Sequence, residues 1–255
     1  MGNEINPNMN SYVRDTDYKG SNKSMPTNES YEDSNVFYEV DENGNEVRRF
    51  VDEDKDGKAD RVITMNSDGQ IASEIIDLDR DGQSDNHVDY EYGSSTDTIE
   101  SVRHVDFDMD GNSDVHAYVD ENQVIHAEDI DLNDNGSVDV HVDYSYDNGI
   151  EQRAIDYNLD GKPDQYTNVD TTSNKITSEV FDSDKNGRPD TVVEYSYDEE
   201  GNESGSSERN IKPLTSGLPE GYSISGHKIF NGDGEEVGVV INNTDGTQTL
   251  YEYTD

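Results

Sequence analysis

The chain has 255 residues and a formal net charge of −42 at pH 7, with only 29% hydrophobic residues. Such an acidic chain repels nucleic acid and anionic lipid, so both are excluded as partners. Its like charges oppose any compact state, and its apolar residues are too few for a conventional core. There are no cysteines, so neither disulfides nor thiolate sites stabilise it. Folding therefore requires counter-ions.

Residues 1–35 are rich in Asn, Ser, Asp and Glu and show no apolar period. This composition predicts a disordered N-terminal leader. The stretch from Met1 to Asn10 has neither the basic region nor the apolar core of a signal peptide, and no stretch of the chain is long and apolar enough to insert into a membrane.

The next part of the chain repeats one nine-residue frame, D-x-D-x-D-G-x-x-D, in which Asn replaces some Asp residues. Six copies begin 25 to 29 residues apart, each with glycine at position 6 and aspartate at position 9. The copies, numbered here as loops one to six, begin at Asp52, Asp77, Asp106, Asp131, Asp156 and Asp182.

The frame has the chemistry of a calcium loop. Side-chain oxygens at positions 1, 3 and 5 surround one point, while the glycine allows a sharp turn. Position 7 offers a backbone carbonyl and position 9 a last carboxylate. These are the hard oxygen ligands that calcium prefers, and no sulfur or imidazole lies among them. The sequence therefore predicts up to six bound Ca2+ ions, with folding coupled to their binding.

Short segments on both sides of the loops alternate apolar and polar residues, as half-buried strands do. Turn sequences such as Asp147-Asn148-Gly149 separate the repeats, and no segment has helical periodicity. We expect an elongated all-β repeat: a meander of antiparallel hairpins with the metal loops along one edge. A β-solenoid is the alternative. Arg and Glu alternate three residues before each loop, from Arg49 and Glu74 onward, which suggests a cross-strand ladder of opposite charges.

The predicted domain organisation has four parts. After the leader, residues 36–198 form the six-loop calcium-binding domain. Residues 199–220 form a polar linker. Residues 221–255 are β-like again but lack the frame, so we expect a small β-meander that acts as a cap or docking module.

The loops resemble those of the integrin α β-propeller and its bacterial FG-GAP relatives, and also thrombospondin type 3 and dockerin repeats. The run Tyr195–Asn202 is similar to the YD-repeat turns of bacterial surface and toxin-shell proteins. The EF-hand is a weaker match, because its position-12 glutamate is replaced by residues such as Ile63 and Val88.

By the integrin-type resemblance, the side chains of positions 1, 3, 5 and 9 and the carbonyl of position 7 would be the metal ligands. In loops one to three these are Asp52, Asp54, Asp56, Lys58, Asp60; Asp77, Asp79, Asp81, Gln83, Asp85; and Asp106, Asp108, Asp110, Asn112, Asp114. In loops four to six they are Asp131, Asn133, Asn135, Ser137, Asp139; Asp156, Asn158, Asp160, Lys162, Asp164; and Asp182, Asp184, Asn186, Arg188, Asp190.

The sequence gives little support for a transition-metal site or for catalysis. His87, His116 and His141 each lie two residues after a loop, but this column is incomplete, so we interpret it as strand surface and not as a transition-metal site. Serine nucleophile elbows, phosphate-binding glycine loops and zinc-protease helices are absent from the sequence, so we expect no enzyme activity.

We expect a calcium-dependent structural or adhesion module of a bacterial surface or extracellular matrix, whose partner is another protein or a surface polymer. The alternative is a sensor or buffer of calcium or lanthanide ions. Because such loops suit millimolar calcium, we expect an extracellular or cell-surface location, with the cytoplasm as the alternative.

Overall fold

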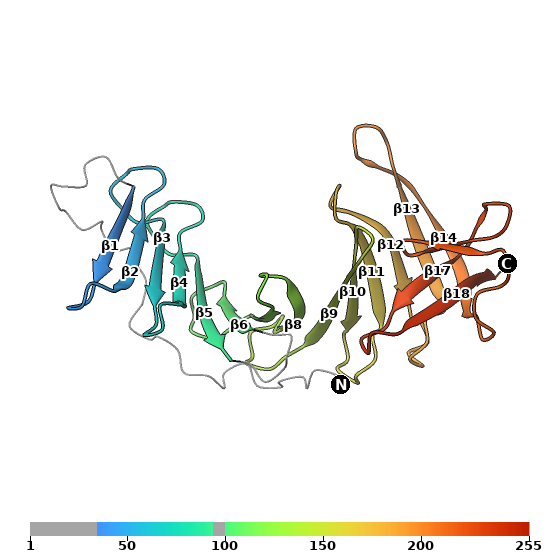
Figure 1. Ribbon diagram of the computed structural model, residues 1–255, viewed down its shortest axis with the longest axis horizontal. Coiled ribbons are helices and arrows are strands. Elements are labelled where there is room, and N and C mark those ends of the chain that lie inside the picture. The colour runs from blue at the N-terminus through green and yellow to red at the C-terminus, as the bar shows by residue number, and fades with distance from the viewer. Residues whose placement is uncertain (1–34, 94–99, 255) are drawn as a thin grey trace. The chain divides into compact units, whose positions relative to one another are not determined.

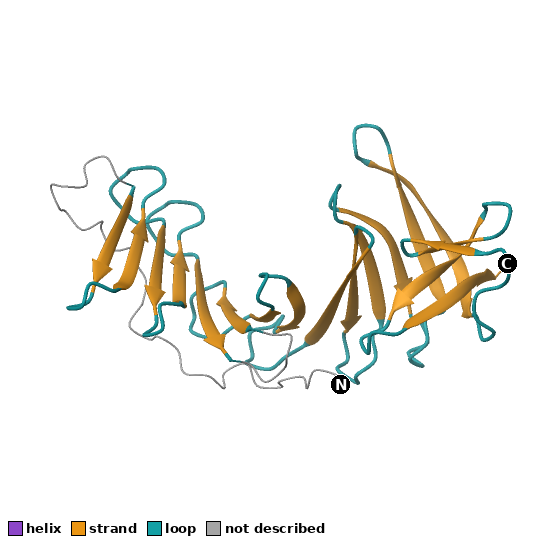
Figure 2. Cartoon of the chain, in the orientation of Figure 1, coloured by secondary structure: helices purple, strands orange, loops and turns teal. Residues whose placement is uncertain are grey.

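The computed structural model describes residues 35–93 and 100–254, and the predicted leader lies outside this part of the chain except for residue 35. The described residues form eighteen β-strands and no helix (Figure 2). The chain divides into two compact units, with the boundary between Val138 and Asp139. We call them the N-terminal and C-terminal units. None of the described residues belongs to a helix that could cross a membrane.

The N-terminal unit contains eight strands, each paired antiparallel with the next along the chain (Figure 1). They are β1 (Val36–Val40), β2 (Glu46–Val51), β3 (Arg61–Met65), β4 (Ile71–Ile76), β5 (Asn86–Tyr92), β6 (Ser101–Asp106), β7 (Val115–Val119) and β8 (Ile125–Ile130).

The C-terminal unit contains ten strands. They are β9 (Val140–Asp147), β10 (Ile150–Asp156), β11 (Gln165–Asp170), β12 (Lys175–Phe181), β13 (Thr191–Tyr197), β14 (Glu203–Pro213), β15 (Ser223–Ser225), β16 (Lys228–Phe230), β17 (Glu236–Asn242) and β18 (Gln248–Thr254). Consecutive strands pair from β9 to β14 and from β15 to β18, and β14 also pairs with β18.

The predicted meander of antiparallel hairpins is confirmed. Because consecutive strands reverse direction, the nine-residue loops and the tight turns fall at opposite edges of each sheet (Figure 1). A β-solenoid would place equivalent strands of successive coils in parallel, whereas every pairing among the described strands is antiparallel.

The hairpin register follows one rule. At the first, second, third, fifth and sixth loops, the residue two before the loop lies opposite the residue two after it, and this pair is buried. The pair is Phe50 with Val62 at the first loop and Val180 with Val192 at the sixth. All four side chains are at most 2% exposed. The strands adjoining these five loops therefore meet through buried side chains.

The C-terminal unit has the larger apolar core. Ala154, Tyr166, Val180 and Val192 form one cross-strand row from β10 to β13. Residues of the C-terminal meander cover this row, among them Val239, Ile241 and Tyr251.

A ladder of buried polar side chains continues this packing. Ser178 accepts from the Asn168 amide at 3.0 Å, and the Gln152 amide donates to Asn168 at 2.8 Å. The oxygen of Gln152 then accepts the Asn242 N–H at 2.8 Å. Strand β17 is thus held against β10 by hydrogen bonds as well as by apolar contact.

The segment expected to be a linker contains strand β14, whose eleven residues are mostly exposed. Only Ile211 is buried there, because the backbone bonds to β13 and β18 hold this strand without an apolar face. The meander of residues 221–255 shares its core with β10–β14. It therefore belongs to the same compact unit as the fifth and sixth loops.

The Arg–Glu column does not form a direct ladder. Arg49 and Glu74 lie on either side of Ile63, so one strand separates them. Their ion-pair partners are Glu46 and Arg61. The register instead places each arginine of the column opposite a tyrosine, whose ring lies beneath the guanidinium. These pairs are Arg49 with Tyr38, Arg103 with Tyr90 and Arg153 with Tyr144.

His227 makes the stability of the C-terminal unit depend on pH. Burial lowers its pKa from 6.5 to about 4, helped by the charge of Lys228. As the pH falls from 6.5 to about 4, His227 binds a proton in the unfolded chain but stays neutral in the folded chain. The free energy of unfolding should therefore drop by about 3 kcal/mol at most between pH 7 and pH 4. Urea unfolding of the full chain in calcium, compared with His227→Gln, measures this contribution. An identical pH dependence in both proteins would contradict it.

Candidate metal centres

The first aspartate of each loop is buried at the end of the preceding strand. The six are between 3% and 6% exposed. In every loop the N–H of the position-6 glycine donates to this carboxylate, as from Gly82 to Asp77 at 2.8 Å and from Gly111 to Asp106 at 3.0 Å. This bond folds the loop back over its own start and fixes a carboxylate at its base.

The last aspartate closes the loop from the other side. In the first, second, third, fifth and sixth loops its backbone N–H donates to the carbonyl of the residue before the loop, as from Asp85 to Ile76 at 2.9 Å. Its carboxylate accepts the N–H of position 2, as from Leu78 at 2.7 Å. The same side-chain bond is present in the first, third, fifth and sixth loops. Positions 1 and 9 are therefore drawn together by the backbone itself.

Two left-handed residues make the turn. The glycine at position 6 has a positive φ in all six loops, as expected from the frame. Position 4 is also left-handed, although it is never glycine: Lys55, Arg80, Met109, Asp134, Leu159 and Lys185 have φ between 54° and 64°. Sequence reasoning missed this position, because no glycine or asparagine marks it there.

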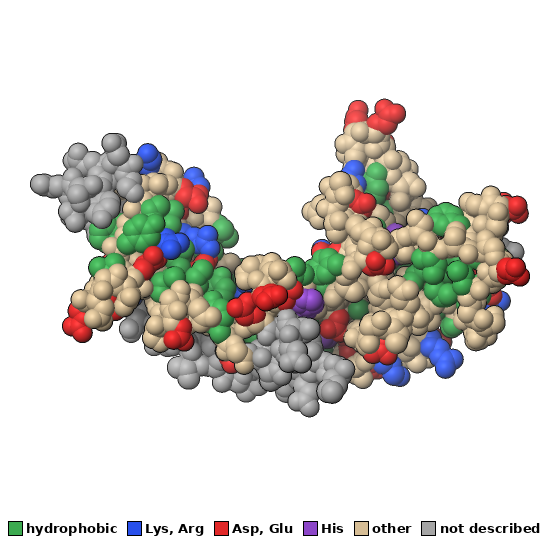
Figure 3. Space-filling view, viewed as in Figure 1, with side chains coloured by type: hydrophobic (Ala, Val, Ile, Leu, Met, Phe, Trp, Pro, Cys, Tyr) green, Lys and Arg blue, Asp and Glu red, His purple; other side chains and the backbone are tan. Residues whose placement is uncertain are grey.

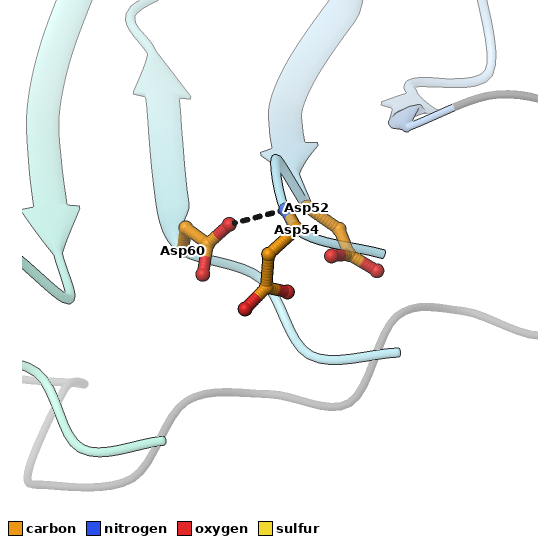
Figure 4. Close-up of side chains that lie close together, drawn as sticks. All are labelled: Asp52, Asp54 and Asp60. Carbon is orange, nitrogen blue, oxygen red and sulfur yellow. Dashed lines mark hydrogen bonds between the residues drawn. The ribbon is translucent and has the colours of Figure 1, made fainter. Parts of the chain in front are cut away.

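Four loops bring three carboxylates together. In each, ligand oxygens of positions 1, 3 and 9 lie within 4.8 Å of one another. The clusters are Asp52, Asp54 and Asp60; Asp77, Asp79 and Asp85; Asp106, Asp108 and Asp114; and Asp182, Asp184 and Asp190. Figure 4 shows the first cluster, where the Asp54 N–H donates to the Asp60 carboxylate. Such acidic groups are positioned to hold a metal ion.

Positions 5 and 7 are arranged differently. The carboxylate of Asp81 is exposed and accepts the N–H of Gln83 at 2.7 Å, and equivalent bonds occur in the first, third and fifth loops. The position-5 side chains do not belong to the four position-1, -3 and -9 clusters. They therefore brace the turn and would have to rotate to coordinate an ion.

The fourth and fifth loops carry asparagine at position 3. In the fifth loop the Asn158 amide nitrogen donates to both carboxylate oxygens of Asp164 at 3.0 Å. A half-turn of this amide would present its oxygen as a ligand instead. The unit boundary falls inside the fourth loop, so Asp139 belongs to the C-terminal unit and the other four predicted ligands to the N-terminal unit.

Neighbouring loops lie side by side in pairs. The N–H of Asp77 donates to the Asp60 carbonyl at 2.8 Å, joining the first and second loops, and Asp182 donates likewise to Asp164 at 3.0 Å. A basic side chain at position 4 spans each of these pairs. Arg80 contacts Glu53 at 2.5 Å, and Lys185 contacts Asp164 at 4.0 Å.

The third and fourth loops are the exception to this pattern of a bridging basic side chain. Position 4 of the fourth loop is Asp134, which joins Asp108 and Asp110 of the third loop in another carboxylate cluster. Partial desolvation and the neighbouring Asp110 raise the pKa of Asp134. The pKa of Asp114 is raised as well, first by burial and then by Asp108 and other loop carboxylates. Negative charge is thus least compensated around the third loop.

Comparisons with known proteins add little to this geometry. No family model matches the chain, and no curated protein sequence does. Among solved structures, a match titled "Crystal Structure of TcdB2-TccC3 without hypervariable C-terminal region" has a TM-score of 0.21 and 12% identity. It covers 86% of this chain and 14% of that one. "Crystal Structure of TcdB2-TccC3-TEV" has a TM-score of 0.19 and 11% identity, with the same coverage. Neither similarity supports an argument about function.

The left-handed glycine can be tested without disturbing packing. Gly161 has φ +84° and no atom within 4 Å of the place that a methyl group would take, whereas Gly205 has equally open space and no positive φ. Gly161→Ala should destabilise the C-terminal unit by roughly 1 to 2 kcal/mol, because only the left-handed backbone is penalised. Gly205→Ala should change stability by less than about 0.5 kcal/mol. Urea unfolding in calcium compares them, and equal stability would refute the strain argument.

Proposed function

We propose that this chain is a calcium-binding structural module whose folding and rigidity depend on the bound ions. The observation that carries the proposal is the repeated cluster of three loop carboxylates, at least one of them buried in each case. A buried carboxylate is costly unless a cation or hydrogen bonds compensate it. The glycine N–H supplies one hydrogen bond to it, and the remaining charge calls for a cation.

The donor set favours calcium over transition metals. Every predicted ligand is a carboxylate, amide or carbonyl oxygen, and the loops contain no histidine. Hard divalent cations prefer such oxygens, and calcium accepts the flexible geometry that a nine-residue loop offers. Lanthanide ions share this preference and would occupy the same clusters.

The role is structural in this proposal, because the ions substitute for missing apolar contacts. In the N-terminal unit the apolar cluster consists of Phe50, Ala59 and Val62, with Phe37 packed against it. Acidic side chains are visible elsewhere on the surface, for example at the tip of the β13–β14 hairpin (Figure 3). Calcium at the loop edge would offset part of the formal net charge of −42 and hold adjacent strands in register.

A module of this kind suits an extracellular or cell-surface setting, where calcium is abundant, with adhesion to a protein or a surface polymer as its output. No catalytic role is proposed. The alternative output is sensing or buffering of the ion itself. The affinities separate the two: uniformly weak sites favour the extracellular module, and graded sites that fill at cytosolic concentrations favour the sensor.

The dependence of folding on calcium is tested by far-ultraviolet circular dichroism and hydrodynamic size. Removing metal with a chelator should reduce the β-sheet signal and expand the chain, and adding calcium should restore both. Magnesium at the same concentration is the control, since it demands a stricter octahedral geometry. A β-sheet signal unaffected by chelation would reject the proposal.

Individual sites are tested by calorimetry. Asp106→Asn removes one buried ligand charge and should weaken binding at one site by at least about tenfold, or about 1.4 kcal/mol. The control Asp233→Asn changes an exposed turn outside the loops and should leave binding unchanged. Among the native loops, the fourth should bind weakest, because it has only two ligand aspartates, Asp131 and Asp139. Equal loss in both variants would indicate nonspecific charge attraction.

A further inference from the structure

The C-terminal unit contains a cluster of charged side chains that belongs to none of the six loops. We call it the Lys228 cluster. Its members are Glu194 on β13, Arg209 on β14, Lys228 on β16, Glu236 on β17 and Tyr253 on β18. Glu194 is 9% exposed, so its carboxylate is largely withdrawn from water. Five strands thus bring an amine and two carboxylates together inside one compact unit.

The amine of Lys228 contacts both carboxylates. Nζ donates to Oε1 of Glu194 at 2.8 Å and to Oε2 of Glu236 at 2.7 Å. A useful contrast is Lys212, which meets one carboxylate, that of Glu252, at 3.0 Å, where both side chains are exposed. The arrangement at Lys228 therefore places a second acid beside a lysine–glutamate pair, in a site that is only partly open to solvent.

The other two members of the cluster orient the carboxylates. The Arg209 guanidinium lies 3.3 Å from Oε2 of Glu194, and Oε1 is left to face Lys228. The Tyr253 hydroxyl donates to Oε1 of Glu236 at 2.5 Å, and Oε2 is left to face Lys228. Each carboxylate is thus held through one oxygen and presents the other to the amine. Such fixed proximity is the condition under which a bimolecular reaction becomes intramolecular.

The two carboxylates also differ in acidity. Burial, followed by the hydrogen bond with Glu236, raises the pKa of Glu194. Burial also acts to raise the pKa of Glu236, but hydrogen bonds with Glu194, Lys228 and Tyr253 outweigh it and lower that pKa. A proton shared by this pair therefore resides on Glu194. Glu194 is the carboxylic acid that an amine can attack, and Glu236 remains an anion that can accept a proton.

We propose that Lys228 and Glu194 form an isopeptide bond, which joins Nζ of Lys228 to Cδ of Glu194. The ammonium first passes a proton to Glu194, which leaves a neutral amine beside a carboxylic acid. Nζ then attacks Cδ and gives its next proton to Glu236, while the negative charge that develops on Oε2 faces Arg209. Glu236 returns the proton to Oε1, the C–O bond breaks, and water leaves.

The reaction balances within the cluster. One C–N bond replaces one C–O bond, one water is released, and no oxidant or other reagent takes part. The total charge is unchanged, because one positive and one negative charge are lost together. A cavity of about 770 Å³ adjoins the site and is lined in part by Arg209, Glu236 and Tyr253, which gives the water a way out.

The bond would connect strands that share no backbone pairing. Strand β13 pairs with β12 and β14, whereas β16 pairs with β15 and β17. A covalent link between them would tie the C-terminal meander to the strands beside the sixth loop. The chain has no cysteine, so disulfides cannot provide such a link. The isopeptide bond would strengthen a structural module, but its formation does not rest on the proposed calcium binding.

The test is the mass of the full-length chain, folded in calcium and then denatured for mass spectrometry. We expect the mass to be lower than that of the sequence by one water molecule. Tryptic digestion should yield the peptide that contains Lys228 joined to the peptide that contains Glu194. Lys228→Arg keeps a positive charge but removes the nucleophile, so it should retain the full mass. Glu236→Gln removes the proton acceptor and should retain the water as well.

The matched control is Lys212→Arg, which alters the exposed lysine–glutamate pair and should lose the water as the wild-type chain does. A wild-type chain of full mass would overturn the proposal. So would a loss of water that persists in Lys228→Arg, because it would come from elsewhere, such as a cyclic imide at an Asp–Gly pair. The cross-linked peptide of the wild-type chain decides the question even if a variant fails to fold.

Discussion

The fold depends on the compensation of negative charge at the base of each loop. Every loop begins with an aspartate at most 6% exposed, in a chain whose net charge is −42. A glycine N–H satisfies part of this carboxylate, and the last aspartate of the loop lies within reach of the same point in four loops. Without a cation, the loop carboxylates would repel one another where adjacent strands are joined. With one bound, as proposed above, the same positions would become attachments between adjacent strands and would help a chain with few apolar residues to fold.

The two units solve the packing problem differently. In the C-terminal unit the row beside the loops is apolar, and the last strands cover it with Val239, Ile241 and Tyr251. In the N-terminal unit the row through Phe50 and Val62 continues to Ile75 and His87. A different row of the same sheet is polar from β5 to β8, where it runs from Asp89 to Asp129. The same hairpin geometry therefore holds an ordinary core in one place and a row of ionisable groups in another. The hairpin register is the same in both units, and the side chains determine whether a row forms an apolar core or carries ionisable groups.

Much of this organisation follows from sequence patterns. The glycine and aspartate frame predicts the loops, and the alternating strands predict an antiparallel meander. Three features were not predictable. Strand β14 is almost wholly polar, so no periodicity marks it. The left-handed backbone at position 4 is imposed by the loop and not by its residues, which include Met109 and Leu159. The pairing of His104 with His116 requires the hairpin register, which shows that equal distances on either side of a loop meet across it.

Under the proposed calcium binding, the acidic residue at position 4 of the fourth loop has a consequence for how the molecule would lose its ions. Between the first and second loops, and between the fifth and sixth, Arg80 and Lys185 remain as fixed positive charges when the metal leaves. Beside the third loop, Asp134 adds repulsion to Asp108 and Asp110 instead. If calcium fills the loops as proposed, its depletion would leave the strands around the third loop the least cohesive, and opening of the sheet would start there. One side chain per pair of loops would then set the order in which the repeats come apart.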